Sequence, residues 1–259
     1  MNGTLRALVL MAVAAVLAGC EETPYWQQPM AENGLVVILP GIQGVDDSVY
    51  SINRGLDQAG LRQAVVIQTW GKPVPIAGML LNQVDKLGCR LDAVAIAGKI
   101  MAYQNHFPDK PVHIIGHSAG GAVAVFVTEG LSDQAPAGAK PIEGLVLLSP
   151  SISNIYDLTK SLSMCNKGIL NCYNPNDVAL LGVGTTVLGN LDGLPGPSAG
   201  LDGFAPLSEL DRADKKAVYE NKLTQLLVSS YGEAHFASTN SSFIAGEPAA
   251  WIMGLRRRR

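Results

Sequence analysis

Of all residues in this sequence, a serine that lies between glycines is the clearest candidate for a chemically reactive group. The pentad Gly116 to Gly120 (GHSAG) follows the apolar run Val112 to Ile115 and precedes a stretch rich in Gly, Ala and Val. A sharp strand-to-helix turn with this pattern exposes the hydroxyl of Ser118, and its glycines are needed because side chains would clash in so tight a turn. Ser118 is therefore a candidate nucleophile. The alternative is a turn in which Ser118 only caps the next helix.

A serine hydroxyl needs partners before it can attack a carbonyl carbon. It is a poor nucleophile at neutral pH, so a base must take its proton and a carboxylate must orient that base. Two N–H donors must also hold the oxyanion that forms on attack. The other parts of the chain have to supply these groups.

The elements that would position these groups alternate between strand and helix. Solid apolar runs predict six strands, and stretches with apolar positions three and four apart predict helices between them. The predicted strands cover residues 35–39, 63–69, 112–116, 145–149, 169–173 and 223–229, and the longest predicted helices cover 48–59, 91–106 and 119–131. This alternation predicts an α/β fold, with a mostly parallel central sheet, right-handed crossovers and helices on both faces.

Composition sets the broad class. Of 259 residues, 47% are hydrophobic and 16% are charged, a balance that excludes a disordered chain and suits one domain without internal repeats. The net charge of -3 argues against binding to nucleic acid. The basic run at 256–259 is expected to be a solvated tail. Because no cysteine pair has metal-site spacing and the four histidines are scattered, we expect no metal and no cofactor.

The first residues are typical of an export segment. Arg6 precedes the apolar run Ala7 to Ala18, which is too short to span a bilayer and predicts a signal peptide over 1–19. The string Leu17-Ala18-Gly19-Cys20 resembles the lipobox of bacterial lipoproteins.

That resemblance implies cleavage before Cys20 and lipidation of this cysteine, with residues 20–33 as a tether to a domain over 34–255. Several acyl chains give stable anchoring, whereas one chain binds a membrane only marginally. Because Glu21 and not Asp follows the cysteine, resemblance to enterobacterial sorting favours the outer membrane, facing the periplasm.

Three further cysteines leave two possibilities open. An oxidising compartment permits one disulfide, and Cys165 and Cys172 are the nearest pair in sequence. The alternative is that these residues and Cys89 are buried free thiols.

With this turn and this alternation, the sequence resembles the α/β-hydrolase superfamily over roughly residues 35–245. In that family the nucleophile comes first in the chain, the acid second and the histidine last. His106 ends a predicted helix, His113 lies inside a predicted strand, and His117 belongs to the serine turn. Only His235 follows the last predicted strand, where the family places its catalytic base.

The resemblance also indicates an acid. In the family it emerges just beyond the penultimate strand, and Asp177 lies in a turn directly after the predicted strand at 169–173. Asp177 is therefore the favoured acid, although Asp157, Asp192 and Asp202 remain alternatives. Asp177 as a plain turn residue is the structural alternative.

Two backbone amides are expected to form the oxyanion hole. One belongs to Ala119, the residue after the nucleophile. The other belongs to Ile42, because the turn Pro40 to Gly44 resembles the family's His-Gly-x-x-Gly turn. Pro40 stands where the family has histidine, but a backbone donor depends little on side-chain identity.

The resemblance implies a serine hydrolase that cleaves ester-type bonds, of carboxylesterase or lipase-like character, with an ester or lipid substrate and a membrane anchor. The alternative is a non-catalytic envelope lipoprotein that uses this scaffold for binding. The Gly-rich segment 178–203 is a candidate lid over the acyl pocket; a solvent-exposed insertion is the alternative.

Overall fold

A computed structural model describes residues 23–72, 85–178, 190–194, 196–208, 213–228, 230–232 and 234–255. The predicted signal peptide, Cys20 and the basic tail lie outside these residues, as do residues 179–189 and 195 of the candidate lid. Over the part of the chain that is described, no helix is long and apolar enough to cross a membrane.

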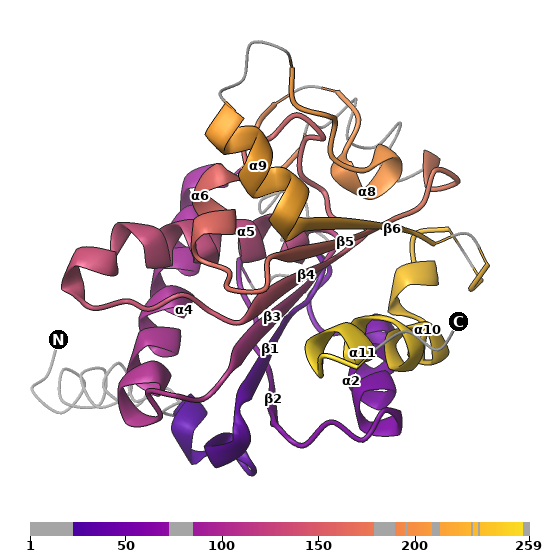
Figure 1. Ribbon diagram of the computed structural model, residues 1–259. Helices are drawn as coiled ribbons and strands as arrows, with labels where there is room; N and C mark the ends of the chain where they lie inside the picture. The colour runs from indigo at the N-terminus through magenta and orange to yellow at the C-terminus, as the bar shows by residue number, and fades with distance from the viewer. Residues whose placement is uncertain are drawn as a thin grey trace, which may run out of the picture.

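A six-stranded parallel sheet forms the centre of the molecule (Figure 1). Its order is β2-β1-β3-β4-β5-β6, and every pairing is parallel. The strands are β1 (Leu35–Leu39), β2 (Ala64–Ile67), β3 (Val112–His117), β4 (Gly144–Leu148), β5 (Ile169–Tyr173) and β6 (Leu223–Leu227). The prediction of six strands in a parallel sheet is confirmed, with the two edge strands, β2 and β6, shorter than expected.

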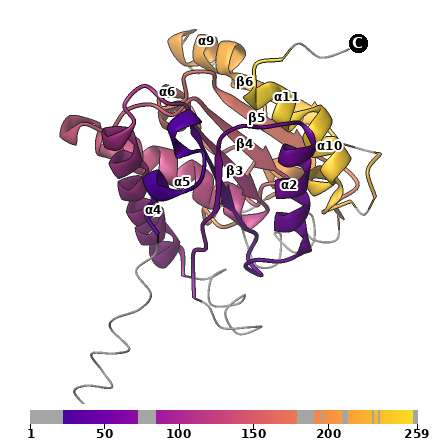
Figure 2. The same ribbon diagram turned by 90° about the horizontal axis from the view of Figure 1, so that it is seen from below.

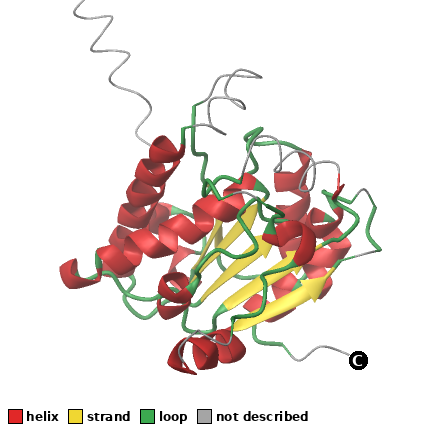
Figure 3. Cartoon of the chain, turned by 90° about the horizontal axis from the view of Figure 1, so that it is seen from above, coloured by secondary structure: helices red, strands yellow, loops and turns green. Residues whose placement is uncertain are grey.

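Helices cover both faces of the sheet (Figures 2 and 3). Side chains alternate along β1, so Val37 faces one hydrophobic cluster and Ile38 faces the other. The first cluster includes side chains of α4 (Lys86–His106), α5 (Ala119–Asp133), α6 (Thr159–Ser163) and α9 (Ala213–Lys222). The second includes those of α2 (Asp47–Gln58), α10 (Ser241–Gly246) and α11 (Pro248–Ile252). The predicted α/β fold with two helical layers is therefore confirmed.

Helix α4 begins five residues before the predicted start. Asp85 is its N-cap, and its carboxylate accepts a hydrogen bond from the Gly88 N–H at 2.9 Å. Such a cap satisfies a donor that has no partner within the helix. The first turn contains Gly88, a weak helix former, so the sequence favoured a later start.

The segment before β1 is packed, which corrects the expected tether. Its short turns η1 (Tyr25–Gln27) and η2 (Ala31–Asn33) lie beside α4 (Figure 2). Tyr25 is buried and donates to Gln68 Oε1 at 2.6 Å, while Tyr103 on α4 donates to the Ala31 carbonyl at 2.6 Å. The packed domain therefore begins near Tyr25 and not at residue 34.

Three cysteines among the described residues are buried and form no disulfide: Cys89, Cys165 and Cys172. Cys165 belongs to the first cluster and Cys172 to the second, so the two side chains lie on opposite faces of the sheet and do not form the disulfide considered from the sequence. Burial raises the pKa of the Cys165 thiol to about 12.

Candidate active site

Ser118 lies in a strained turn between β3 and α5. Its backbone has φ 54° and ψ -123°, outside the regions that L-residues commonly adopt. Such strain costs about 1 to 3 kcal/mol and persists only where the surroundings enforce it. Here the Ser118 N–H donates to the Leu148 carbonyl, and the Ser118 carbonyl accepts from the Ser151 N–H, both at 2.9 Å. The end of β4 therefore holds the turn in place.

Close backbone packing explains the glycines around this serine. A Cβ at Gly116 would lie 2.4 Å from the Gly120 carbonyl oxygen, and a Cβ at Gly120 would lie 2.2 Å from the Pro40 carbonyl oxygen. No side chain fits at such distances. The motif thus brings β3, the start of α5 and the loop after β1 into direct contact.

His235 links Ser118 to Asp177. The Nε2 atom of His235 lies 3.1 Å from Ser118 Oγ, and its Nδ1 lies 2.5 Å from Asp177 Oδ2. His235 is 8% exposed and Asp177 is 2% exposed. If Nδ1–H is donated to the carboxylate, Nε2 is left as an acceptor for the serine proton. Ser118 makes no side-chain cap bond to α5, so it does not serve as a helix cap.

Two connections that the sequence did not indicate hold these loops together. Asn174 accepts from the Asn176 N–H at 3.1 Å and donates through Nδ2 to the Ala234 carbonyl at 2.9 Å. It therefore joins the Asp177 turn to the His235 loop. At the end of β4, Ser149 Oγ lies 2.9 Å from Ser238 Oγ and fixes the other side of that loop. The sequence identified Asn174 only as part of a turn.

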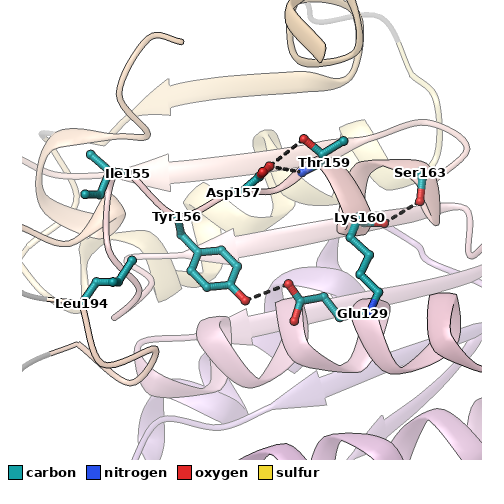
Figure 4. A pocket seen from close by; sticks show the side chains of 8 residues that line it. All are labelled: Glu129, Ile155, Tyr156, Asp157, Thr159, Lys160, Ser163 and Leu194. Atoms are coloured by element: carbon teal, nitrogen blue, oxygen red, sulfur yellow. Dashed lines mark hydrogen bonds between the residues drawn. The ribbon is translucent and has the colours of Figure 1, made fainter. Parts of the chain in front are cut away.

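The alternative carboxylates lie elsewhere. Asp157 accepts from the Thr159 N–H at 2.9 Å and pairs with Lys215 at 3.3 Å. It lines a surface hollow of about 650 Å³, where Tyr156 donates to Glu129 (Figure 4).

Asp192 accepts from the Ser153 N–H at 3.3 Å, and burial raises its pKa. Asp202 is an exposed residue at the end of α8 (Ala199–Asp202). Of the four aspartates considered from the sequence, the structure brings Asp177 to His235.

The loop after β1 lies against the serine. A Cβ at Gly41 would lie 3.4 Å from Ser118 Cβ, and the Gly44 N–H closes the turn on the Gly41 carbonyl at 3.0 Å. Ile42 follows Gly41 in this turn. The Pro40 carbonyl accepts a hydrogen bond from the indole N–H of Trp70 at 2.8 Å.

The second expected donor, Ala119, is the first residue of α5. The first amides of a helix have no partner within it, and the helix dipole makes this end positive. The loop and the helix start meet where the strand order reverses between β1 and β3, which is where open parallel sheets bind ligands.

His117 is a neighbour of the candidate base that the sequence reasoning set aside. Its ring centroid lies 5.1 Å from that of His235, and its Nδ1 lies 3.3 Å from Ser48 Oγ. Burial, with a smaller contribution from the nearby His235, lowers the pKa of His117 to about 3. The neutral ring therefore packs against His235 without opposing a positive charge there.

Metal-ligand geometry is absent from the described ranges, because they contain no group of three or more His, Cys, Asp or Glu side chains that could hold a metal ion.

The chain is similar in shape to several solved structures of low sequence identity. A hormone-sensitive lipase from a metagenome library has a TM-score of 0.47 and 11% identity, covering 86% of this chain and 79% of that chain. Esterase PE8 has a TM-score of 0.47 and 11% identity, covering 86% and 93%. TT1662 from Thermus thermophilus has a TM-score of 0.48 and 13% identity, covering 88% and 90%. A search of curated proteins gave no match.

The family comparison covers the centre of the fold. Residues 36–181 match the family described as "Alpha/beta hydrolase of unknown function (DUF900)". This match spans more than half of the 259 residues and includes both Ser118 and Asp177. The chain therefore belongs to this α/β-hydrolase family.

Proposed function

We propose that the chain is a serine hydrolase that cleaves ester-type bonds through an acyl-enzyme intermediate, with carboxylesterase or lipase-like activity. The observation that supports this proposal most strongly is the continuous contact from Asp177 through His235 to Ser118. Its position at the carboxyl edge of the sheet, beside a turn of backbone donors, gives the serine a place to meet a carbonyl carbon.

In the proposed reaction, Ser118 Oγ attacks the carbonyl carbon while His235 Nε2 takes its proton. The tetrahedral intermediate places a negative charge on oxygen, which accepts hydrogen bonds from the Ile42 and Ala119 N–H groups. His235 then gives its proton to the leaving alcohol, and the acyl group stays on Ser118. A water molecule, deprotonated by the same imidazole, releases the acid.

Asp177 has two roles in this scheme. Its carboxylate orients the ring so that Nε2 faces the serine, and it stabilises the imidazolium that forms during attack. Because Asp177 is 2% exposed, water screens this interaction little.

The proposal also includes the place in the cell where the protein acts. A lipobox ending at Cys20 supports an envelope lipoprotein, with the outer membrane facing the periplasm favoured, and lipid or other acyl esters as substrates. Growth of a bacterial host with an alkyne fatty acid tests the anchor: the wild-type chain should take up the label and Cys20→Ser should not. A wild-type chain without label would contradict this part of the proposal.

Activity is tested with a fluorophosphonate probe and p-nitrophenyl esters of increasing chain length. Wild type should be labelled and should hydrolyse at least one ester, and Ser118→Ala should do neither. Ser163→Ala, at an exposed serine of α6, is the matched control and should behave as wild type. If folded wild type is not labelled, the non-catalytic binding lipoprotein is favoured, and Pro40 in place of the family's histidine would be its first explanation.

A further inference from the structure

Helix α4 has an unusual outer face. Leu87, Leu91 and Val94 are 71%, 62% and 49% exposed, and their spacing of four and three residues places them on one stripe. The buried face of the same helix includes Ile96 and Ile100. A surface helix is normally polar on its outer side, whereas this one carries the apolar stripe there, with the exposed Arg90 beside it. Single exposed apolar residues need no explanation, but a contiguous row of them marks an interaction site.

The stripe continues into an apolar groove beside the N-terminal segment. This groove has a volume of about 360 Å³. Its walls include Trp26 and, from α4, Lys99 and the small residues Ala95, Gly98 and Ala102. Fifteen residues of helix separate Leu87 from Ala102, a length of about 22 Å. We call the surface from Leu87 to Trp26 the α4 face. It lies on one outer side of the molecule (Figures 1 and 2).

The position of Cys20 indicates what covers this face. Cys20 is three positions before Thr23, which lines the groove. An extended chain advances at most about 3.6 Å per residue, so Cys20 lies within about 11 Å of Thr23. Acyl chains on Cys20 that enter a bilayer would therefore bring the membrane surface to the edge of the groove.

From the apolar stripe and this short reach, we infer that the α4 face lies on the membrane surface, with Leu87, Leu91, Val94 and Trp26 in contact with the lipid. The inference rests on the lipidation proposed above. Apolar helix faces and tryptophan rings are both suited to the boundary between headgroups and acyl chains.

This orientation also places the candidate active site beside the lipid. Helix α4 leads into β3, so its first residues lie at the carboxyl edge of the parallel sheet, where Ser118 lies. The Leu87 end of the α4 face is therefore at the edge of the sheet that carries the serine. An acyl ester leaving the bilayer would have a short path to that edge.

Because the native thiols are buried, a cysteine introduced on the surface can be labelled selectively. The lipidated full-length chain carries Leu91→Cys, and the new thiol is labelled with an environment-sensitive NBD dye. Leu227→Cys is the matched control, because Leu227 lies on the edge strand β6 and is 52% exposed. In phosphatidylethanolamine/phosphatidylglycerol vesicles the dye at 91 should brighten at least threefold and be quenched by doxyl-labelled lipids, and the dye at 227 should change by less than a fifth.

Two results would overturn the inference. With lipidation of Cys20 demonstrated by the alkyne fatty acid, a dye at 91 that stays as exposed to water as the dye at 227 would show that the face points away from the bilayer. A dye at 91 that becomes shielded without vesicles, in proportion to protein concentration, would show that a second copy covers it.

A separate arm distinguishes failure of the anchor from failure of the face. A chain starting at Glu21 contains every described residue but no site for the lipid. It should sediment with the same vesicles at least tenfold more than its Leu87→Ser/Leu91→Ser variant, while a Leu227→Ser/Leu255→Ser control should match it. Equal sedimentation of all three chains would overturn the inference, whether or not Cys20 is lipidated.

Discussion

Replacement of Asp177 by asparagine tests the central relay, because it keeps the shape of the side chain and removes its charge. In the proposed reaction His235 becomes an imidazolium 2.5 Å from the carboxylate. At an effective dielectric constant of about 20, unit charges at this separation attract by about 6 to 7 kcal/mol. An amide retains part of this as a hydrogen bond, which leaves an expected loss of about 4 to 5 kcal/mol in the transition state.

Tautomer preference acts in the same direction. An asparagine that donates to Nδ1 stabilises the ring form with its proton on Nε2, and this form cannot accept the proton of Ser118. At 1.36 kcal/mol per factor of ten, the loss corresponds to a decrease of about 10³ to 10⁴ in kcat/KM for a p-nitrophenyl ester. The decrease should be in kcat, with KM nearly unchanged, because the interaction is made only in the transition state.

Two control variants and one structural measurement complete this experiment. Asp157→Asn and Asp202→Asn should keep kcat/KM within about twofold of wild type, because neither carboxylate lies at His235. The melting temperature of Asp177→Asn shows whether the chain is folded. The reasoning would be refuted if folded Asp177→Asn retained more than a tenth of wild-type activity.

Three further predictions concern stability and the thiols. Burial lowers the pKa of His113 to about 3, so the unfolded chain takes up a proton between pH 6.5 and 3 that the folded chain refuses. The free energy of unfolding should therefore decrease on acidification through that window by up to about 1.4 kcal/mol per pH unit for this histidine. Urea unfolding from pH 7 to 4 should show a smaller decrease for His113→Leu, and equal slopes would contradict the prediction. Gly55→Ala places a Cβ 2.6 Å from the Ile244 Cβ, so we expect a loss of about 1 to 2 kcal/mol in urea unfolding despite the better helix propensity of alanine. In the chain that starts at Glu21 and so lacks Cys20, Ellman's reagent should find no reactive thiol when the chain is folded and three after denaturation, those of Cys89, Cys165 and Cys172. A single thiol after denaturation would indicate a disulfide.

Local sequence patterns were sufficient to predict much of the fold. Buried parallel strands are solid apolar runs, so β1 and β5 could be predicted to the residue, and the glycines around Ser118 are required by contacts within the same turn and its neighbour. The start of α4 was missed because Gly88, two residues into the helix, is a weak helix former and favours a later start. The packing of Tyr25 was also missed, since its partner Gln68 is remote in sequence.

The same distinction applies to the candidate site. The chain order implied by the family resemblance singled out His235 and favoured Asp177, but excluding the other three aspartates required the structure, because each of them follows a strand or lies in the next loop. The amide of Asn174 and the Ser149–Ser238 contact join segments about 60 and 90 residues apart. Such contacts depend on how the strands are ordered in the sheet, and no spacing along the chain encodes that order.

The order of the strands also explains how distant residues reach one place. Ser118 and Asp177 follow β3 and β5, and the strand between them, β4, bonds to both: its Leu148 carbonyl accepts from the Ser118 N–H, and the Ser149 N–H donates to the Cys172 carbonyl. The parallel register therefore fixes the separation of nucleophile and acid before His235 is added. The histidine loop belongs to no strand, and it is held by Asn174 from the β5 side and by Ser149 from the β4 side. Its position is thus determined by the same two strands that position its partners, so the contact between base, acid and serine is a consequence of the sheet.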